Sequence, residues 1–253
     1  MESKNNKIVF LRHGESQWNK ENRFTGWTDV NLTEIGEKEA VKAGILLKKE
    51  LFQFDLVFSS VLKRAIDTMK ICLSTMNFDD SMPIEYDWRL NERHYGALQG
   101  LNKSDTAKKY SEKQVLLWRR SYNTSPPLLD FKDKRHPRFD LKYQHLDADE
   151  LPIGECLKDT VKRVKPLWEN IIVPKILLGK KILIVAHGNS LRSIVKIINN
   201  ISDQDIINVN IPTGIPFVYE LDEKLNPIRN YYLGDHKELQ KRLASVINQG
   251  KSN

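Results

Sequence analysis

Short apolar runs alternate along the chain with longer segments in which apolar residues recur at helical spacing. The apolar runs predict buried strands at residues 7–12, 54–60, 83–90, 180–186 and 215–221, with an edge strand at 230–233. The helical spacing predicts helices at residues 33–51, 61–74, 156–171 and 191–198. Strands that alternate with helices indicate an α/β fold whose mostly parallel sheet is covered on both faces.

The segment from residue 91 to residue 150 interrupts this alternation. It contains many charged residues and three prolines, and it is too poor in apolar residues to form a core of its own. We therefore expect an irregular helical cap insertion at about 91–150, and a tail at about 236–253 that is a short helix or disordered. The prediction is a single domain over residues 1–253, a three-layer α/β/α sandwich with a mostly parallel central sheet.

Composition agrees with a globular protein that has a substantial core, since 40% of the 253 residues are hydrophobic and 29% are charged. No apolar run approaches the roughly 20 residues of a membrane helix, and the first residues lack the apolar segment of a secretory signal. The two cysteines, Cys72 and Cys156, match neither a zinc site nor a disulfide framework. We expect a cytoplasmic protein that does not associate with a membrane.

The formal net charge is +7, from 40 Lys and Arg against 33 Asp and Glu. Such an excess is compatible with nucleic acid, an anionic membrane or small anionic ligands. Basic and acidic residues are interspersed without a block of like charge, and this pattern favours small anions. Nucleic-acid binding would require a basic stripe with exposed aromatic residues, and the sequence gives no reason to expect one.

Polar and charged residues follow the predicted parallel strands at the point where each strand ends. They are Arg12-His13-Gly14, Ser59-Ser60 with Lys63-Arg64, Asn91-Glu92-Arg93-His94-Tyr95-Gly96, and His187-Gly188-Asn189. The carboxyl ends of parallel strands meet at one edge of a sheet, where α/β proteins bind their ligands. We therefore expect these residues to line one crevice.

Two histidines, two arginines and a glutamate in one crevice suit phosphoryl transfer. Arginines bind phosphate in a planar, bidentate manner, and they disfavour the protonated form of a nearby histidine, which is then nucleophilic. A glutamate can move the proton of the group that gives or accepts the phosphoryl. The loops GxGxxG and GxxxxGK[ST] and the zinc motif HExxH are absent, which weakens nucleotide and zinc chemistry. The pattern predicts a phosphohistidine enzyme in which arginine charge serves in place of a metal ion.

Each of these residues has a simpler interpretation when it is taken alone. A single histidine after a strand is more often a hydrogen-bonded structural residue, and a single arginine is more often part of a surface ion pair. Their coincidence at successive strand ends favours the catalytic interpretation. For His94, His136, His145 and His236 the residues alone support only the structural role.

With these residues in place, the sequence resembles the histidine phosphatase superfamily and, within it, the cofactor-dependent phosphoglycerate mutases of glycolysis. The resemblance covers about residues 7–250. It is carried by LRHGESQWNKENRFTGW, SVLKRAIDT, RLNERHYGALQGLNK, WRRSYNTSPP, AHGNSLRSIVK and NIPTGIPFVYELDE. The triplet RHG alone is a weak signal, whereas the long strings together are very specific.

The resemblance implies a role for each matching position. His13 is expected to be the phosphorylated nucleophile, and Glu92 the acid and base for the substrate hydroxyl. The residues expected around the transferred phosphoryl group are Arg12, Arg64 and His187. Substrate-binding positions for this group, the carboxylate and the second phosphate are expected at Ser16, Asn19, Thr25, Gly26, Arg93, His94, Tyr95, Lys103, Arg119, Arg120, Gly188 and Asn189.

The implied activity is that of a 2,3-bisphosphoglycerate-dependent mutase that interconverts 3-phosphoglycerate and 2-phosphoglycerate in glycolysis and gluconeogenesis. 2,3-Bisphosphoglycerate is expected as the primer, without a metal ion, and minor bisphosphoglycerate synthase and phosphatase activities are expected. The cap and the tail are expected to shield the phosphohistidine from water. The resemblance also implies small phosphorylated substrates as partners, neither nucleic acid nor a membrane, and a homodimer with a tetramer as the alternative.

Two features depart from the family pattern. The string LPIGECL at 151–157 places Gly154 and Cys156 where a Glu-Ser pair after a polar turn is expected. The lysines scattered over 132–145 are specific to this sequence. The first departure concerns the junction of cap and core more than the chemistry.

Three rival functions remain open. Bisphosphoglycerate synthases resemble this sequence but carry Gly where Ser16 stands and lack the Thr25-Gly26 pair, so these residues favour a mutase. A phosphatase would hydrolyse the phosphohistidine faster than it passes the phosphoryl group on. A non-enzymatic phosphate or phosphopeptide binder could use the same crevice, but such a protein is expected to have lost His13 or Glu92, and both are present.

Overall fold

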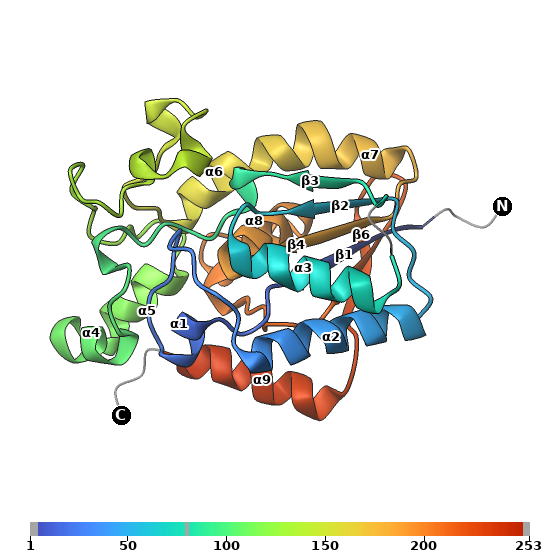
Figure 1. Cartoon of the computed structure of the whole chain (residues 1–253), viewed down its shortest axis with the longest axis horizontal. Coiled ribbons are helices and arrows are strands. Elements are labelled where there is room, and N and C mark those ends of the chain that lie inside the picture. Colours follow the sequence, from blue (N-terminus) through green and yellow to red (C-terminus); the bar gives the residue numbers. More distant parts are fainter. Residues whose placement is uncertain (1–4, 79–80, 250–253) are drawn as a thin grey trace.

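The computed structural model of the chain describes residues 5–78 and 81–249. Within these residues, strands form one sheet in the order β3-β2-β4-β1-β5-β6 (Figure 1). Their bounds are β1 (Asn6–Arg12), β2 (Leu56–Ser59), β3 (Ile84–Tyr86), β4 (Ile182–Ala186), β5 (Phe217–Leu221) and β6 (Pro227–Tyr232). β3, β2, β4 and β1 are parallel, whereas β5 pairs antiparallel with β1 and with β6. The predicted mostly parallel sheet is confirmed, and β6 is the predicted edge strand.

Helices cover both faces of this sheet, as predicted for a three-layer α/β/α sandwich (Figure 1). The α-helices are α1 (Gln17–Lys20), α2 (Glu34–Lys49), α3 (Lys63–Thr75), α4 (Lys103–Tyr110), α5 (Glu112–Arg120), α6 (Leu157–Leu167), α7 (Val173–Leu177), α8 (Gly188–Ile198) and α9 (His236–Asn248). A π-helical turn, Trp168–Ile172, joins α6 to α7. Short 3-10 turns are Trp88–Leu90, Gly96–Leu98, Pro137–Phe139, Leu141–Tyr143, Ala148–Glu150 and Asp205–Asn208.

Alternation along the central strands divides the interior into two cores. In β1, Ile8 and Phe10 pack with α6, α7 and α8, whereas Val9 and Leu11 pack with α2 and α3. Successive side chains of a strand point to opposite faces, so a strand buried on both sides reads as a continuous apolar run. This explains why the sequence runs at 7–12 and 180–186 show no polar alternation.

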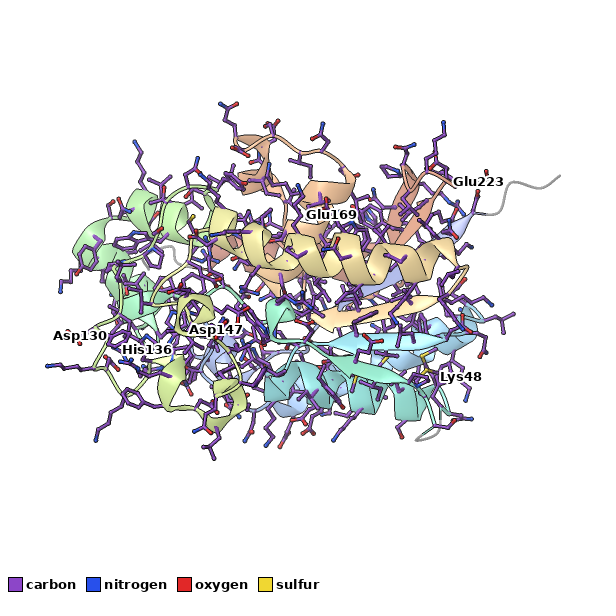
Figure 2. The ribbon with its side chains drawn as sticks, turned by 90° about the horizontal axis from the view of Figure 1, so that it is seen from above. Lys48, Asp130, His136, Asp147, Glu169 and Glu223 are labelled. Atoms are coloured by element: carbon purple, nitrogen blue, oxygen red, sulfur yellow. The ribbon has the colours of Figure 1, made fainter. Side chains whose placement is uncertain are left out.

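The segment 91–150 leaves the sheet at the edge where the parallel strands end, as predicted for the cap insertion. In Figure 2, Asp130, His136 and Asp147 lie at this end of the molecule, opposite Glu223 in the turn between β5 and β6. Apolar side chains of the cap form a small cluster that is separate from the two cores, and Phe24, from the segment between α1 and α2, completes this cluster. Its packing therefore depends on the N-terminal part of the chain.

The tail forms helix α9 up to Asn248, while residues 250–253 lie outside the described part. Asp235 caps this helix by accepting a hydrogen bond from the Glu238 N–H. Two ion pairs join α9 to α2. Arg242 of α9 pairs with Glu39 of α2, and Glu238 of α9 pairs with Lys42 of α2. Of the two expectations for the tail, the helix is the one the structure contains.

Candidate active site

The residues predicted at the strand ends come together at one edge of the sheet. The register places Arg12 beside Ala186, and the His13 N–H donates to the Ala186 carbonyl at 3.1 Å. His13 and His187 therefore lie side by side, with ring centroids 4.9 Å apart. A pocket at this edge is lined by Arg12, His13, Asn19, Arg23, Thr25, Gly26, Arg64, Glu92, Tyr95, Lys103, Arg119, Arg120, Gly188, Asn189, Val246 and Gln249.

The loop after β1 packs closely against the start of α2, and this contact explains the glycine that follows His13. A Cβ atom on Gly14 would lie 2.2 Å from the Gly36 carbonyl oxygen. The Gly14 N–H donates to Thr68 Oγ1 on α3 at 2.9 Å, which fixes the loop from the other side. A residue with a side chain at this position would push the histidine-bearing loop away from α2.

His13 is held as a neutral imidazole with one nitrogen free. Its Nδ1 lies 2.7 Å from the Gly14 carbonyl oxygen, which can only accept, so Nδ1 carries the proton and Nε2 keeps its lone pair. Burial, then the positive charges of Arg64 and Arg12, hold the pKa of His13 well below its usual range. A neutral imidazole with an unprotonated Nε2 is the form that can attack phosphorus.

His187 lies beside His13 at the N-terminal end of α8. Its Nε2 is 2.7 Å from Ser60 Oγ, and its buried Nδ1 has no hydrogen-bond partner among the described residues. Burial, then the charge of Arg64, holds the pKa of His187 well below its usual range. A buried ring nitrogen without a partner is costly unless a ligand completes it, and a phosphoryl oxygen beside His13 could accept from Nδ1–H.

Arg12 and Arg64 supply positive charge to the pocket and are fixed by backbone carbonyls. Arg12 Nη1 donates to the Ile211 carbonyl at 2.8 Å, and its buried Nε has no partner among the described residues. Arg64 donates to the carbonyls of Thr28 and Gly26 at 3.0 and 2.8 Å. Burial lowers the pKa of Arg12 and lowers that of Arg64 to about 10. Both remain cations at neutral pH, and their charge is available to a phosphoryl group.

The Glu92 carboxylate is fixed through one oxygen only. Its Oε1 accepts from the Arg93 N–H at 2.7 Å, the Asn189 N–H at 3.1 Å and Asn189 Nδ2 at 2.8 Å. Burial alone would raise the pKa of Glu92, but the charge of Arg12 and these hydrogen bonds outweigh it and lower that pKa. Oε2 accepts no hydrogen bond from the described residues, so one oxygen is left for a proton of the substrate.

A second group of cations lines the same pocket and consists of Arg23, Lys103, Arg119 and Arg120. Arg119 and Arg120 end helix α5, and Lys103 begins α4. Burial, then the neighbouring charge of Arg119, holds the pKa of Lys103 well below its usual range, and burial lowers that of Arg119 to about 10. Together with Arg12 and Arg64, these cations face a single carboxylate among the described lining residues, so the pocket favours multiply charged anions.

The end of the tail closes the pocket over this second cation group. Arg119 donates to the carbonyls of Gln249 and Val246, and Arg120 donates to the Val246 carbonyl at 3.4 Å. The remaining cavity is about 50 Å³, room for a few waters but not for a bisphosphorylated ligand. An anion that binds to these guanidinium groups must therefore displace the tail carbonyls.

Four of the residues predicted for the site are buried beside the pocket and do not line it. They are Ser16, Arg93, His94 and His187. Ser16 caps α1 and donates to Asn19 Oδ1 at 3.0 Å, so it positions a lining residue. Arg93 Nη2 donates to the Arg119 carbonyl.

His94 accepts at Nδ1 from the Gly96 N–H, within the cap. Burial lowers its pKa to about 3, so this histidine is neutral at all ordinary pH values. Its position agrees with the structural role that the residue alone supports. Sequence reasoning did not place Arg23, Val246 and Gln249 in the pocket. Arg23 stands inside the string that carries the resemblance, whereas nothing in the sequence marks the two tail residues.

The described residues contain no group of three or more His, Cys, Asp or Glu side chains that could hold a metal ion. They also contain no helix that is long and apolar enough to cross a membrane. Both cysteines are free and buried, and burial raises the pKa of Cys72 to about 12.

Comparison with solved structures shows the same fold in two phosphatases and in a protein named as a hydrolase. A mycobacterial glucosyl-3-phosphoglycerate phosphatase has a TM-score of 0.65 and 21% identity, over 90% of this chain and 97% of that chain. The alpha-ribazole phosphatase from Shigella flexneri has a TM-score of 0.63 and 20% identity, over 90% and 96%. A structure named mycobacterial hydrolase 1 has a TM-score of 0.68 and 22% identity, over 90% and 96%.

Residues 8–231 match the family described as Histidine phosphatase superfamily (branch 1). This range runs from Ile8 within β1 to Tyr231 within β6 and includes both strand-end histidines. The geometry of His13, His187, Arg12, Arg64 and Glu92 suits the phosphoryl transfer expected of such a protein. The chain belongs to the histidine phosphatase superfamily.

Proposed function

We propose that this protein is a 2,3-bisphosphoglycerate-dependent phosphoglycerate mutase that interconverts 3-phosphoglycerate and 2-phosphoglycerate, an isomerase of glycolysis and gluconeogenesis in the cytoplasm. The observation that carries the proposal is the second cation group, Arg23, Lys103, Arg119 and Arg120. Hydrolysis of one phosphoryl group requires only the charges around His13. A mutase must also hold a carboxylate and a phosphate that does not react, and this requirement accounts for the additional cations.

Each residue of the proposed reaction has a defined task. Phosphorylated His13 gives its phosphoryl group to the 2-hydroxyl of the substrate: the P–N bond breaks, the new P–O bond forms, and the hydroxyl proton passes to Glu92 Oε2. Arg12 and Arg64 neutralise the charge on the equatorial oxygens during transfer, and neutral His187 donates a hydrogen bond to one of these oxygens. After the bisphosphorylated species turns within the site, His13 takes the 3-phosphoryl group and Glu92 returns the proton.

Once the tail carbonyls are displaced, the charged groups of the pocket also suit the bisphosphorylated primer that such a reaction requires. In the group around His13, two buried donors have no partner among the described residues, namely Arg12 Nε and His187 Nδ1. The second cation group would hold the other phosphate. The carbonyls of Val246 and Gln249 now occupy that group, and they could return after binding to exclude water from the phosphohistidine.

A phosphatase is the second candidate function. The groups around His13 suffice for hydrolysis, and the solved structures named above include two phosphatases. Minor phosphatase and bisphosphoglycerate synthase activities follow from the proposed mechanism as well, since water or a different phosphoglycerate can compete for phospho-His13. The proposal therefore concerns the dominant reaction.

The test is an assay with 3-phosphoglycerate in EDTA-treated buffer, with and without trace 2,3-bisphosphoglycerate. The reaction is quenched, and 2-phosphoglycerate and inorganic phosphate are then measured separately. Primer-dependent formation of 2-phosphoglycerate, lost in His13→Ala, is the expected result. Release of inorganic phosphate without 2-phosphoglycerate would assign a phosphatase, and turnover that persists in His13→Ala would remove the nucleophile from the mechanism.

A further inference from the structure

Asn189 is the residue that connects Glu92 to the interior of the protein. Its side-chain Nδ2 donates to Glu92 Oε1 at 2.8 Å and approaches the Tyr95 hydroxyl at 3.3 Å. Its Oδ1 accepts from Arg192 Nη1 at 2.8 Å. A guanidinium can only donate and an ionised carboxylate can only accept, so this pair of neighbours selects one of the two orientations of the amide.

Arg192 is placed by the geometry of α8. Asn189 and Arg192 are separated by three positions on this helix, so their side chains share one face. Arg192 is 1% exposed, and its Nη2 donates to the carbonyls of Arg120 and Ile206 at 3.0 and 2.6 Å. A guanidinium so placed is held at both of its terminal nitrogens and has little freedom to turn away from Asn189.

The burial of Arg192 is not explained by an ion pair. No carboxylate of the described residues lies within salt-bridge distance of it, and its Nε is buried without a partner. A charge buried in this way costs stability, and an apolar side chain of similar volume is generally tolerated better. Arg192 does not line the pocket, so direct contact with a ligand does not account for it either.

We propose that Arg192 is a positioning residue for proton transfer: it fixes the Asn189 amide in the orientation that donates to Glu92, and so keeps Glu92 Oε1 bound and Oε2 free for the substrate proton. The inference rests on the proposed function in one respect, that Glu92 accepts the proton of the group attacking phospho-His13. It applies equally whether that group is a phosphoglycerate hydroxyl or water.

Removal of Arg192 has a predictable effect on the ionised form of Glu92. Without Nη1, the amide of Asn189 can rotate, and Glu92 loses a hydrogen-bond donor that favours its charge. Arg12 from β1, Arg64 from α3 and the backbone N–H groups of Arg93 and Asn189 also face the carboxylate, and all of them remain. The acid limb of the transfer rate should therefore move to higher pH without being abolished.

The experiment compares the wild type with Arg192→Met and with Lys196→Met, the control. Lys196 lies one turn further along α8, where it pairs with Asp203 away from the pocket. Each protein is phosphorylated with 4-nitrophenyl phosphate, whose leaving group needs no proton. Loss of the phosphoryl group to water and to 3-phosphoglycerate is then followed in single turnovers across a pH series.

The expected result for Arg192→Met is an acid limb displaced upward by about one pH unit, the effect of losing one hydrogen bond to a charged group. Phosphorylation of the variant by 4-nitrophenyl phosphate should stay within about threefold of the wild-type rate, because this step needs no proton from Glu92. A merely structural role of Arg192 would instead slow both the phosphorylation of His13 and the transfer to the acceptor. Lys196→Met should match the wild type throughout. Equal slowing of phosphorylation and transfer, or an unchanged pH profile, would overturn the proposal.

Two further arms keep the test decisive. If Arg192→Met does not fold, Arg192→Lys replaces it. A lysine keeps the buried positive charge but lacks the two terminal nitrogens of the guanidinium group, so the same displacement of the acid limb is expected. If the wild type transfers only to water, the mutase proposal fails, while the pH profile with water as acceptor still reports on Arg192. The two hypotheses are therefore tested separately.

Discussion

Gly14→Ala and Gly188→Ala form a matched pair, because each glycine directly follows a site histidine. A Cβ on Gly14 would lie 2.2 Å from the backbone oxygen of Gly36, whereas the nearest atoms to a Cβ on Gly188 are 3.6 Å away. The first contact is about 1 Å too short for carbon and oxygen, and overpacking of this kind costs about 1–3 kcal/mol. The second is ordinary contact at the start of α8, where Ala is favoured over Gly by at most about 1 kcal/mol.

We therefore expect Gly14→Ala to unfold about 2–12 °C below the wild type, at about 2–4 °C per kcal/mol for a chain of this size. Gly188→Ala should unfold at or slightly above the wild-type temperature. Thermal unfolding followed by circular dichroism measures both, and urea titration checks that the m-value is unchanged. A displaced loop beside His13 should also lower turnover by about 10²-fold in Gly14→Ala. Equal stability of the two variants would refute the close packing of the loop against α2.

Three further results are expected. Glu92→Gln should lower kcat in steady-state assays by about 10²–10⁴-fold, the range of general acid–base catalysis. A smaller effect would mean that a group other than Glu92 transfers the proton. Arg120→Met should raise KM for 3-phosphoglycerate while hydrolysis of 4-nitrophenyl phosphate, which has no second anion, stays near the wild-type rate; equal loss on both would contradict the second cation group. Hydrogen bonds from Arg229 lower the pKa of Glu220 to about 2, so the stability that they provide is present above about pH 4.5 and is lost as the pH falls toward 2. Urea unfolding of the wild type and Glu220→Gln should differ at pH 7, differ less at pH 3 and converge near pH 2.

The central sheet could be predicted from the sequence because its strands are buried on both faces. The apolar run at 180–186 contains β4, Ile182–Ala186, and Thr33 caps α2 as its position before Glu34 and Glu37 indicates. The stretch 83–90 was less informative. Only Ile84–Tyr86 pairs with β2, and a 3-10 turn follows because Asp87 accepts from the Arg89 N–H.

The parts of the site that the sequence did not reveal depend on long-range backbone contacts. Val246 and Gln249 reach the pocket because α9 lies alongside α2, and their carbonyls carry no signature in the sequence. Arg192 stands inside the string AHGNSLRSIVK, yet its role becomes visible only when the hydrogen bonds of Asn189 are known. The residue type of a histidine or a glutamate at a strand end already indicates catalysis. A positioning residue can be recognised only from its hydrogen-bond partners in the structure.

The arginines of the site differ from those of the surface in the partners that hold them. On the surface, Arg89 and Arg135 pair with aspartates two positions earlier, and their charge is cancelled. Arg12, Arg64 and Arg192 instead donate to carbonyl oxygens, and no carboxylate of the described residues lies within salt-bridge distance of them. A carbonyl satisfies an N–H group without neutralising the cation.

This choice of partner serves two requirements of phosphoryl transfer at once. Burial and, after it, the uncancelled charge of Arg64 and Arg12 lower the pKa of His13, so its imidazole is held in the neutral form that can act as a nucleophile. The same charge attracts the phosphoryl group and stabilises its oxygens during transfer. A carboxylate in place of the Gly26 or Ile211 carbonyl could accept the same hydrogen bonds, but it would raise the pKa of His13 and repel the phosphate. The folded backbone, rather than a set of acidic side chains, thus holds these arginines and leaves their positive charge available to a phosphoryl group.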